Sequence, residues 1–134
     1  MKTIYFLLAL ISLLFISCEN ETVSESFSVG LESKFKINND YQSLDNYLNF
    51  SITEINDSRC PSDVQCIWEG KVDVKIEVLN PTGGTITLST YRHLIDTIGN
   101  YSFEIKDVSP YPVSTKTIKL EEYDVTLKIV ELNE

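Results

Sequence analysis

Cys60 and Cys66 are the residues whose types and spacing most suggest chemistry. Two thiols at short range can act as a redox pair, supply part of a zinc site, or close a disulfide. Redox pairs of the thioredoxin type follow a C-x-x-C spacing, whereas five residues separate this pair. A structural zinc site needs four nitrogen or sulfur ligands, and the domain adds only His93. We therefore expect neither redox activity nor a bound metal or other cofactor.

Catalytic groups are equally hard to identify. The nucleophile motif G-x-S-x-G is absent, and His93 has no recognisable catalytic spacing, so we expect it to be an ordinary histidine in a loop or at a strand end. With 20 Asp and Glu residues, chance carboxylate pairs are certain to occur, and no one pair can be singled out. The sequence therefore predicts a protein that is not an enzyme.

The N-terminal residues indicate export and lipid attachment. Lys2 precedes an apolar run from Ile4 to Ile16, which is the layout of a secretory signal peptide and is shorter than the roughly 20 residues of a membrane span. Residues 15–18, Phe-Ile-Ser-Cys, resemble a bacterial lipobox, in which the cysteine is acylated and becomes the new N-terminus. The alternatives are an ordinary signal peptide with a chance cysteine at Cys18, or a buried N-terminal helix.

Three segments follow from this interpretation. We expect residues 1–17 to be removed as a lipoprotein signal peptide, residues 18–26 to form the lipidated cysteine and a polar tether, and residues 27–134 to form one β-domain. With Cys18 acylated, the other two cysteines of an exported chain are expected to form a disulfide. The chain-entropy estimate gives such a short loop about 2 kcal/mol of stabilisation.

The charge of the chain limits its partners. Its formal net charge of −9 argues against binding to nucleic acid and against adsorption to anionic lipid. The acyl chains on Cys18 are therefore expected to attach the protein to the bilayer. Glu19 and Glu21, just after that cysteine, resemble a signal for display on the outer membrane. We expect a bacterial cell-envelope location in the outer membrane, with the periplasmic and the surface face both open.

Alternation of apolar and polar residues dominates from Phe27 onward. This pattern predicts antiparallel strands that cover a core with one face. The longest such run spans residues 66–78, and its apolar parity includes Trp68 and Gly70. We therefore expect Trp68 to pack in the core beside the disulfide, with Gly70 on the same face of the longest strand.

Turn residues separate the remaining strands. Residues 80–84 predict a hairpin turn, and the two prolines within 109–112 end another strand. A change of parity near Glu121 and Glu122 predicts a break before the last strand. Residues 40–47 have room for one helical turn. We expect an all-β, monomeric domain of six to eight antiparallel strands, as a small β-barrel or a β-sandwich.

Arg59 has two interpretations. It can be structural, stacked on an aromatic ring or paired with Asp57 or Asp63. Alternatively, it stands out from a rigid loop and contacts a partner, because a pre-ordered loop loses less entropy on binding. The candidate partner-binding residues are those at and around the loop tip: Arg59, Pro61, Ser62, Asp63 and Gln65.

Residues 57–70, DSRCPSDVQCIWEG, resemble the motif D-S-R-C-P-x-x-V-x-C-x-W-x-G of a family of small exported bacterial proteins, many of them lipoproteins. Residues 108–112 and 123–127 are similar to the second half of that family. One departure is Glu69, where alanine is usual. The resemblance implies membership but no activity, because the family itself has none assigned.

A weaker resemblance, in size, lipobox and all-β pattern, is to the potempins, lipoproteins that inhibit secreted peptidases. The main functional hypothesis is therefore a non-catalytic module that binds a protein partner such as a secreted peptidase. The alternatives are a structural envelope lipoprotein without a specific ligand and, last, a small-ligand carrier. Asp96-Thr97-Ile98 also resembles a bacterial O-glycosylation acceptor, although an unmodified loop threonine at Thr97 is an equal expectation.

Overall fold

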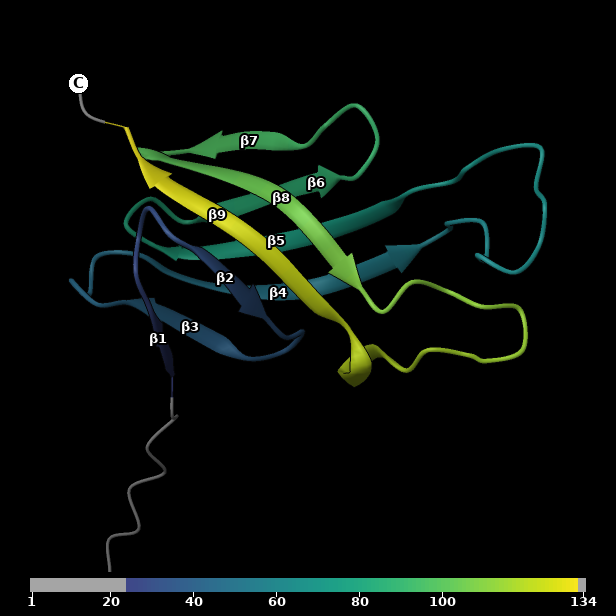
Figure 1. Ribbon diagram of the computed structural model, residues 1–134. Coiled ribbons are helices and arrows are strands. Elements are labelled where there is room, and N and C mark those ends of the chain that lie inside the picture. Colours follow the sequence, from purple (N-terminus) through teal and green to yellow (C-terminus); the bar gives the residue numbers. More distant parts are fainter. Residues whose placement is uncertain (1–23, 133–134) are drawn as a thin grey trace, which may run out of the picture.

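Nine β-strands form two facing sheets in the computed structural model, which describes residues 24–132 (Figure 1). One sheet has the strand order β1-β3-β4-β5-β6 and the other β2-β9-β8-β7. Neighbouring strands are antiparallel except β1 and β3, which are parallel. The bounds are β1 (Glu25–Phe27), β2 (Glu32–Phe35), β3 (Asp40–Ser43), β4 (Asn49–Asp57), β5 (Val72–Asn80), β6 (Gly84–Ser89), β7 (Ile95–Ile98), β8 (Tyr101–Ser109) and β9 (Asp124–Glu131), with a 3-10 turn η2 (Leu120–Glu122).

The predicted all-β fold is confirmed as a sandwich, because the two sheets do not close into one barrel. It has more strands than expected because β1, β2 and β3 are only three or four residues long, too short for a clear alternation. The helical turn expected within residues 40–47 is wrong, since this segment contains β3. The break expected near Glu121 and Glu122 is confirmed by η2.

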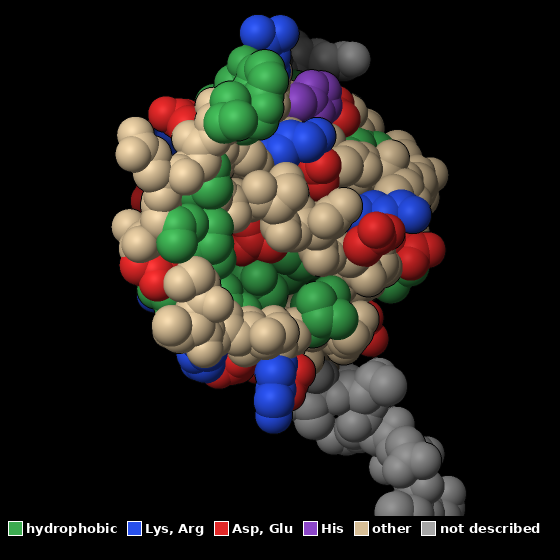
Figure 2. All heavy atoms as spheres, turned by 90° about the vertical axis from the view of Figure 1, so that its right-hand side faces the viewer, with side chains coloured by type: hydrophobic (Ala, Val, Ile, Leu, Met, Phe, Trp, Pro, Cys, Tyr) green, Lys and Arg blue, Asp and Glu red, His purple; other side chains and the backbone are tan. Residues whose placement is uncertain are grey.

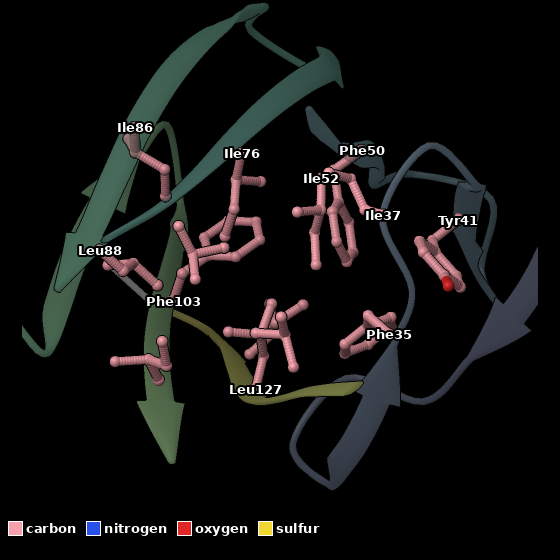
Figure 3. Packing of buried hydrophobic residues seen from close by; sticks show 14 of the residues in the cluster. Phe35, Ile37, Tyr41, Phe50, Ile52, Ile76, Ile86, Leu88, Phe103 and Leu127 are labelled. Atoms are coloured by element: carbon pink, nitrogen blue, oxygen red, sulfur yellow. The ribbon is translucent and has the colours of Figure 1, made fainter. Parts of the chain in front are cut away.

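The core between the sheets is built around Phe50 (Figure 3). The centroid of its ring lies 5.1 to 5.5 Å from those of four other rings, namely Phe27, Phe35, Tyr41 and Phe103. Most of these pairs meet edge to face, which is a favoured aromatic geometry. Alternate residues of β5 extend the same layer: Val72, Val74, Ile76 and Val78. The predicted apolar face of this strand is therefore confirmed from Val72 onward.

Gly70 explains why β5 begins at Val72 and not at Cys66. Its backbone has a φ of +71°, a left-handed conformation that a continuous strand does not contain. A methyl group at this position would lie 1.9 Å from the carbonyl oxygen of Ser58. The chain therefore leaves the strand before Val72, and the parity of Cys66 and Trp68 no longer specifies the core face.

The connections between strands divide the molecule into two ends. One end of the molecule, on the right in Figure 1, carries three connections, and we call it the loop end. These connections are residues 58–71, 90–94 and 110–119. The β1–β2, β3–β4, β5–β6 and β7–β8 turns lie at the opposite end, together with the C-terminal end of β9. We call this the turn end. The described chain begins beside it, at the edge strand β1.

Replacing Gly70 by alanine should destabilise the fold by more than the usual cost of a left-handed residue, which is about 1 to 2 kcal/mol. Gly83 is a matched control because its φ is +66° and its nearest neighbour would lie 4.0 Å from an added methyl group. Chemical denaturation should therefore show a larger loss of unfolding free energy for Gly70→Ala than for Gly83→Ala. Equal losses would contradict the close approach of Ser58.

Candidate functional site

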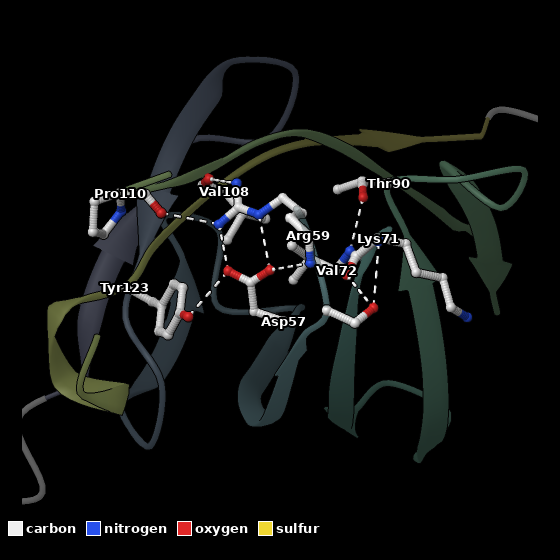
Figure 4. Close-up of polar contacts among 9 residues, drawn as sticks. Asp57, Arg59, Lys71, Val72, Thr90, Val108, Pro110 and Tyr123 are labelled. Carbon is white, nitrogen blue, oxygen red and sulfur yellow. Dashed lines mark hydrogen bonds and ion pairs between the residues drawn. The ribbon is translucent and has the colours of Figure 1, made fainter. Parts of the chain in front are cut away.

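A buried ion pair fixes the base of the β4–β5 loop (Figure 4). The side chains of Asp57 and Arg59 are only 7% and 8% exposed. The Arg59 guanidinium donates through Nη2 to Asp57 Oδ2 at 2.6 Å and through Nε to Asp57 Oδ1 at 2.9 Å. Such a bidentate pair fixes both side chains, because the planar guanidinium matches the carboxylate in only a few orientations.

Arg59 also joins the two sheets. Its Nη1 donates to the carbonyl oxygen of Val108 at 2.6 Å, and Nη2 donates to that of Pro110 at 2.9 Å. Its guanidinium carbon lies 4.6 Å from the centroid of the Tyr111 ring. The side chain therefore connects β4, in the five-stranded sheet, to the end of β8 in the other sheet. The structural interpretation of Arg59 is confirmed in both its forms, pairing with Asp57 and aromatic stacking.

Arg59 leaves little of its side chain exposed to a partner, and its contact with a partner stays a prediction. Its guanidinium lies inside the molecule, because a buried cation needs acceptors and finds them in Asp57 and two backbone carbonyls. Arg59 contributes to the loop end by fixing the position of the β4–β5 loop relative to the end of β8.

The environment keeps Asp57 charged. Burial alone raises the pKa of this carboxyl, but the hydrogen bonds and charge of Arg59 outweigh burial and lower its pKa overall. The Tyr123 hydroxyl donates to Asp57 Oδ2 at 3.1 Å from the other sheet. Burial, followed by this hydrogen bond, raises the pKa of Tyr123 to about 12, so the tyrosine stays a donor.

The disulfide between Cys60 and Cys66 is confirmed, with their Cα atoms 5.9 Å apart. The loop that it closes is attached to residues 110–119. The backbone N–H of Ser62 donates to the Pro112 carbonyl oxygen at 2.9 Å. Asp63 accepts from the backbone N–H of Ser114 at 2.7 Å and from its hydroxyl at 2.6 Å. The loop is thus held at several points to the neighbouring connection.

The residues predicted to bind a partner therefore have different roles in the structure. Ser62 and Asp63 are exposed, but their hydrogen bonds hold the loop to residues 110–119. Pro61 is half-buried, and Gln65 is exposed. Of the predicted set, Gln65 is the residue whose side chain is best placed for a partner.

The prediction that Trp68 packs in the core is wrong. Its side chain is 81% exposed, and that of Ile67 is 93% exposed. The reason is the left-handed Gly70, which separates residues 66–69 from β5. Gly70 is likewise exposed, and its structural role is the close approach to Ser58 and not a place in the core. The tip of the loop therefore presents two large apolar side chains to solvent.

Two hollows flank the segment that carries Trp68. One, of about 540 Å³, is lined by residues that include Trp68, Lys71 and Tyr91. The other, of about 650 Å³, is lined by residues that include Leu94 and Tyr111. Figure 2 faces the loop end and shows hydrophobic side chains gathered on it around a hollow near its middle.

Sequence reasoning missed Tyr91 and Leu94 as surface residues of this site. Both are about half exposed. The available signal was their position in residues 90–94, a stretch with large apolar residues but no sustained alternation.

Other predicted residues lie apart from these hollows. His93 is exposed in the β6–β7 connection, with its Nε2 atom 3.2 Å from Asp96 Oδ2. Thr97 is exposed on the edge strand β7, and its modification stays a prediction. Within residues 24–132, no group of three or more His, Cys, Asp or Glu side chains could hold a metal ion. The predictions about residues 1–17 and Cys18 lie outside the described part of the chain, in which no helix is long and apolar enough to cross a membrane.

Replacing Arg59 by methionine should cost about 3 to 5 kcal/mol of unfolding free energy, because it leaves Asp57 buried without its counter-ion. The matched control is Lys71→Met, which removes a partly exposed ion pair with Asp73 and should cost at most about 1 kcal/mol. Urea denaturation of both variants measures the difference. Similar costs would contradict the structural importance of the buried pair.

The charged form of Asp57 should also make stability depend on pH. Because the pKa of Asp57 is lower in the folded than in the unfolded chain, its stabilisation is complete above a pH of about 4. It is lost as the pH falls through the folded-state value. The unfolding free energy of Asp57→Asn should therefore fall less steeply in acid than that of the unchanged protein. Parallel curves from denaturation at several pH values would refute this expectation.

Comparisons with protein-family models, with curated proteins and with solved structures find no match for this chain. The resemblances drawn from residues 57–70 and from the lipobox therefore stay predictions. The case for a function rests on the geometry of the loop end.

Proposed function

We propose that this protein is a lipid-anchored envelope protein whose β-domain binds a protein partner at the loop end. The observation that carries the proposal is the exposure of Ile67 and Trp68 at the tip of a loop fixed at its base. A large apolar side chain that is kept in water on an ordered loop is typical of an interaction site. Inhibition of a secreted peptidase is the sharpest form of this proposal.

The two exposed side chains have the energetic character of an interface centre. Complete burial of one large apolar side chain contributes about 1.5 to 3 kcal/mol. Tryptophan is enriched among the few residues that dominate binding energy, and these residues gather near the middle of an interface. Trp68 meets this description because it lines one hollow, and the neighbouring Glu69 lines both hollows, so that partner side chains have room beside it.

Charged groups surround this apolar centre as an interface rim would. Glu69 and Lys71 belong to the lining of the hollow beside Trp68. Tyr91 also lines this hollow, and the guanidinium carbon of Arg92 lies 4.9 Å from the centroid of its ring. Groups of both signs next to an apolar centre support a protein partner, whose surface offers both kinds of charge.

The fixed base of the loop supports binding in a second way. The disulfide, the Arg59 contacts and the Asp63–Ser114 hydrogen bonds hold residues 59–66 before any partner arrives. A loop ordered in advance loses less conformational entropy on association. The same property suits a peptidase inhibitor, whose loop occupies a cleft and must keep its shape there.

The alternative functions receive less support. A structural envelope lipoprotein would explain the disulfide and the ion pair but not the exposed Trp68. A small-ligand carrier would need an apolar cavity between the sheets, and the aromatic rings around Phe50 occupy that space.

Replacing Trp68 by alanine should weaken partner binding by at least about 30-fold, the loss expected for a residue worth 2 kcal/mol or more. Stability should be nearly unchanged because the side chain is exposed. The matched control is Tyr47→Ala, which removes an exposed aromatic side chain at the turn end. Peptidase inhibition and crosslinking in envelope extracts, each compared across the three proteins, provide the readout.

A partner or an inhibited peptidase that is lost with Trp68→Ala and kept with Tyr47→Ala would support the proposal. If the unchanged domain inhibits no peptidase and retains no protein, the structural alternative is favoured. If both variants keep full binding, the interface lies elsewhere.

A further inference from the structure

A second group of exposed apolar side chains lies at the turn end. Large apolar or aromatic side chains are exposed in the short β1–β2 and β3–β4 turns. These are Leu31, Leu44 and Tyr47, which are 64%, 67% and 69% exposed. Leu132 follows β9 at the same end and is nearly half exposed. Isolated exposed apolar residues are common, but several at the tips of adjacent turns form a surface that calls for a partner.

Backbone contacts bring these turns together. The N–H of Leu44 donates to the Phe27 carbonyl oxygen at 3.0 Å, which joins the β3–β4 turn to the β1–β2 turn. The N–H of Leu132 donates to the Asn100 carbonyl oxygen at 2.7 Å, which joins the C-terminal end of β9 to the β7–β8 turn. A shallow hollow of about 250 Å³ lies between Val29 and Leu44. The N–H of Gly30 donates to the Ile129 carbonyl oxygen at 2.7 Å, which joins the β1–β2 turn to the C-terminal part of β9. The apolar tips therefore stand on one connected surface.

This surface contains no cation in its turns. Residues 28–31, 44–48, 80–84 and 99–100 include no Lys or Arg, and the carboxylate among them is Asp45. Glu32 and Glu131 add exposed carboxylates at the adjoining strand ends. Hydrogen bonds from the Ser43 hydroxyl and the Tyr47 backbone N–H satisfy Asp45 and lower its pKa. Turn tips that are apolar and lack cations fit a partner surface without net charge. They do not fit an anionic one.

The position of β1 brings this end close to the N-terminal segment. Glu25 is level with Tyr41 in β3, and Tyr41 is paired with Phe50 in β4. Leu48, at the turn end, lies two residues from Phe50, which is about 7 Å along a strand. Asp57, at the loop end, lies seven residues from Phe50, which is about 23 Å. Six residues separate Cys18 from Glu25, and the seven steps between their Cα atoms can span at most about 25 Å. The chain therefore leaves the domain nearer to the level of the turn end than to that of the loop end, and an acylated Cys18 leaves the turn end free to reach the bilayer.

We infer that the turn end rests on the membrane surface, with Leu31, Leu44 and Tyr47 in the interfacial region of a bilayer of net-neutral lipid. The inference rests on the acylation of Cys18 that belongs to the proposed function. It adds an orientation: the strands stand away from the bilayer, and Trp68 points into the aqueous space. Leucine and tyrosine suit this layer, because tyrosine prefers the membrane–water interface and leucine the acyl chains.

The single tryptophan of the chain allows a direct test. The lipidated protein, reconstituted in phosphatidylcholine vesicles with brominated acyl chains, is compared with vesicles of unbrominated lipid. Bromine quenches only indoles that lie in the bilayer. Three proteins place a single tryptophan at three distances from the proposed bilayer surface. They are the unchanged chain with Trp68, and the variants Leu44→Trp and Thr87→Trp, each combined with Trp68→Phe. Thr87 is exposed on β6 along the side of the sandwich.

We expect bromine to remove most of the emission of the Leu44→Trp variant and to leave the other two unchanged. Leu31→Trp with Trp68→Phe provides a second reporter from another turn, and denaturation curves show whether each variant folds. Quenching of Trp68 would mean that the loop end faces the bilayer, and quenching of the Thr87→Trp variant would mean that the domain lies on its side. Either result, or the absence of quenching at every position, would overturn the inference.

These failures differ from a failure of the proposed function. If mass spectrometry shows acylated Cys18 and Trp68→Ala still abolishes partner binding, an unquenched Leu44→Trp variant refutes only the orientation. If the protein carries no acyl chain and does not stay with the vesicles, the proposed lipid anchor is wrong, and the inference is refuted with it.

Discussion

The ion pair between Asp57 and Arg59 is the interaction on which the loop end depends. Removing two charges from water is costly unless hydrogen bonds replace the lost hydration. Here those bonds come from the opposite sheet, since Val108, Pro110 and Tyr123 all belong to the chain around β8 and β9, whereas the ion pair lies at the end of β4. The ends of β4 and β8 must therefore stay at one separation for the charges to remain satisfied. The disulfide loop and the exposed tip are built on that fixed base.

Much of the fold could be predicted because its strands are half buried. In β5, β8 and β9 one parity faces the core, so the alternation is visible without any other information. The disulfide could be predicted for a similar reason, because the distance between its cysteines is set mainly by the five residues between them. Strand alternation and the disulfide both depend on residues that are close together in the sequence, so the sequence pattern alone indicates them.

The candidate site was harder to predict because it depends on backbone groups. The exposure of Trp68 follows from the sign of φ at Gly70, and the alternation of residues 66–78 gave no sign that the strand was interrupted. A glycine inside a strand pattern was the available warning. Apart from Asp57, which the sequence offered, the acceptors of Arg59 are carbonyl oxygens about fifty residues away, and every residue type carries such an oxygen. No motif could identify them.

The same backbone acceptors have a consequence for variation. The end of β8 and the β8–β9 connection hold the cysteine loop through the carbonyl oxygens of Val108, Pro110 and Pro112, which do not depend on side-chain identity. The bonds between Asp63 and Ser114 add contacts that do depend on it. Ile67 and Trp68, in turn, are exposed and contribute little to the packing of the domain. Residues on either side of the hollows can therefore change without loss of the underlying support. If the proposed function holds, substitutions at these exposed positions would change the choice of partner while the folding requirements stay the same.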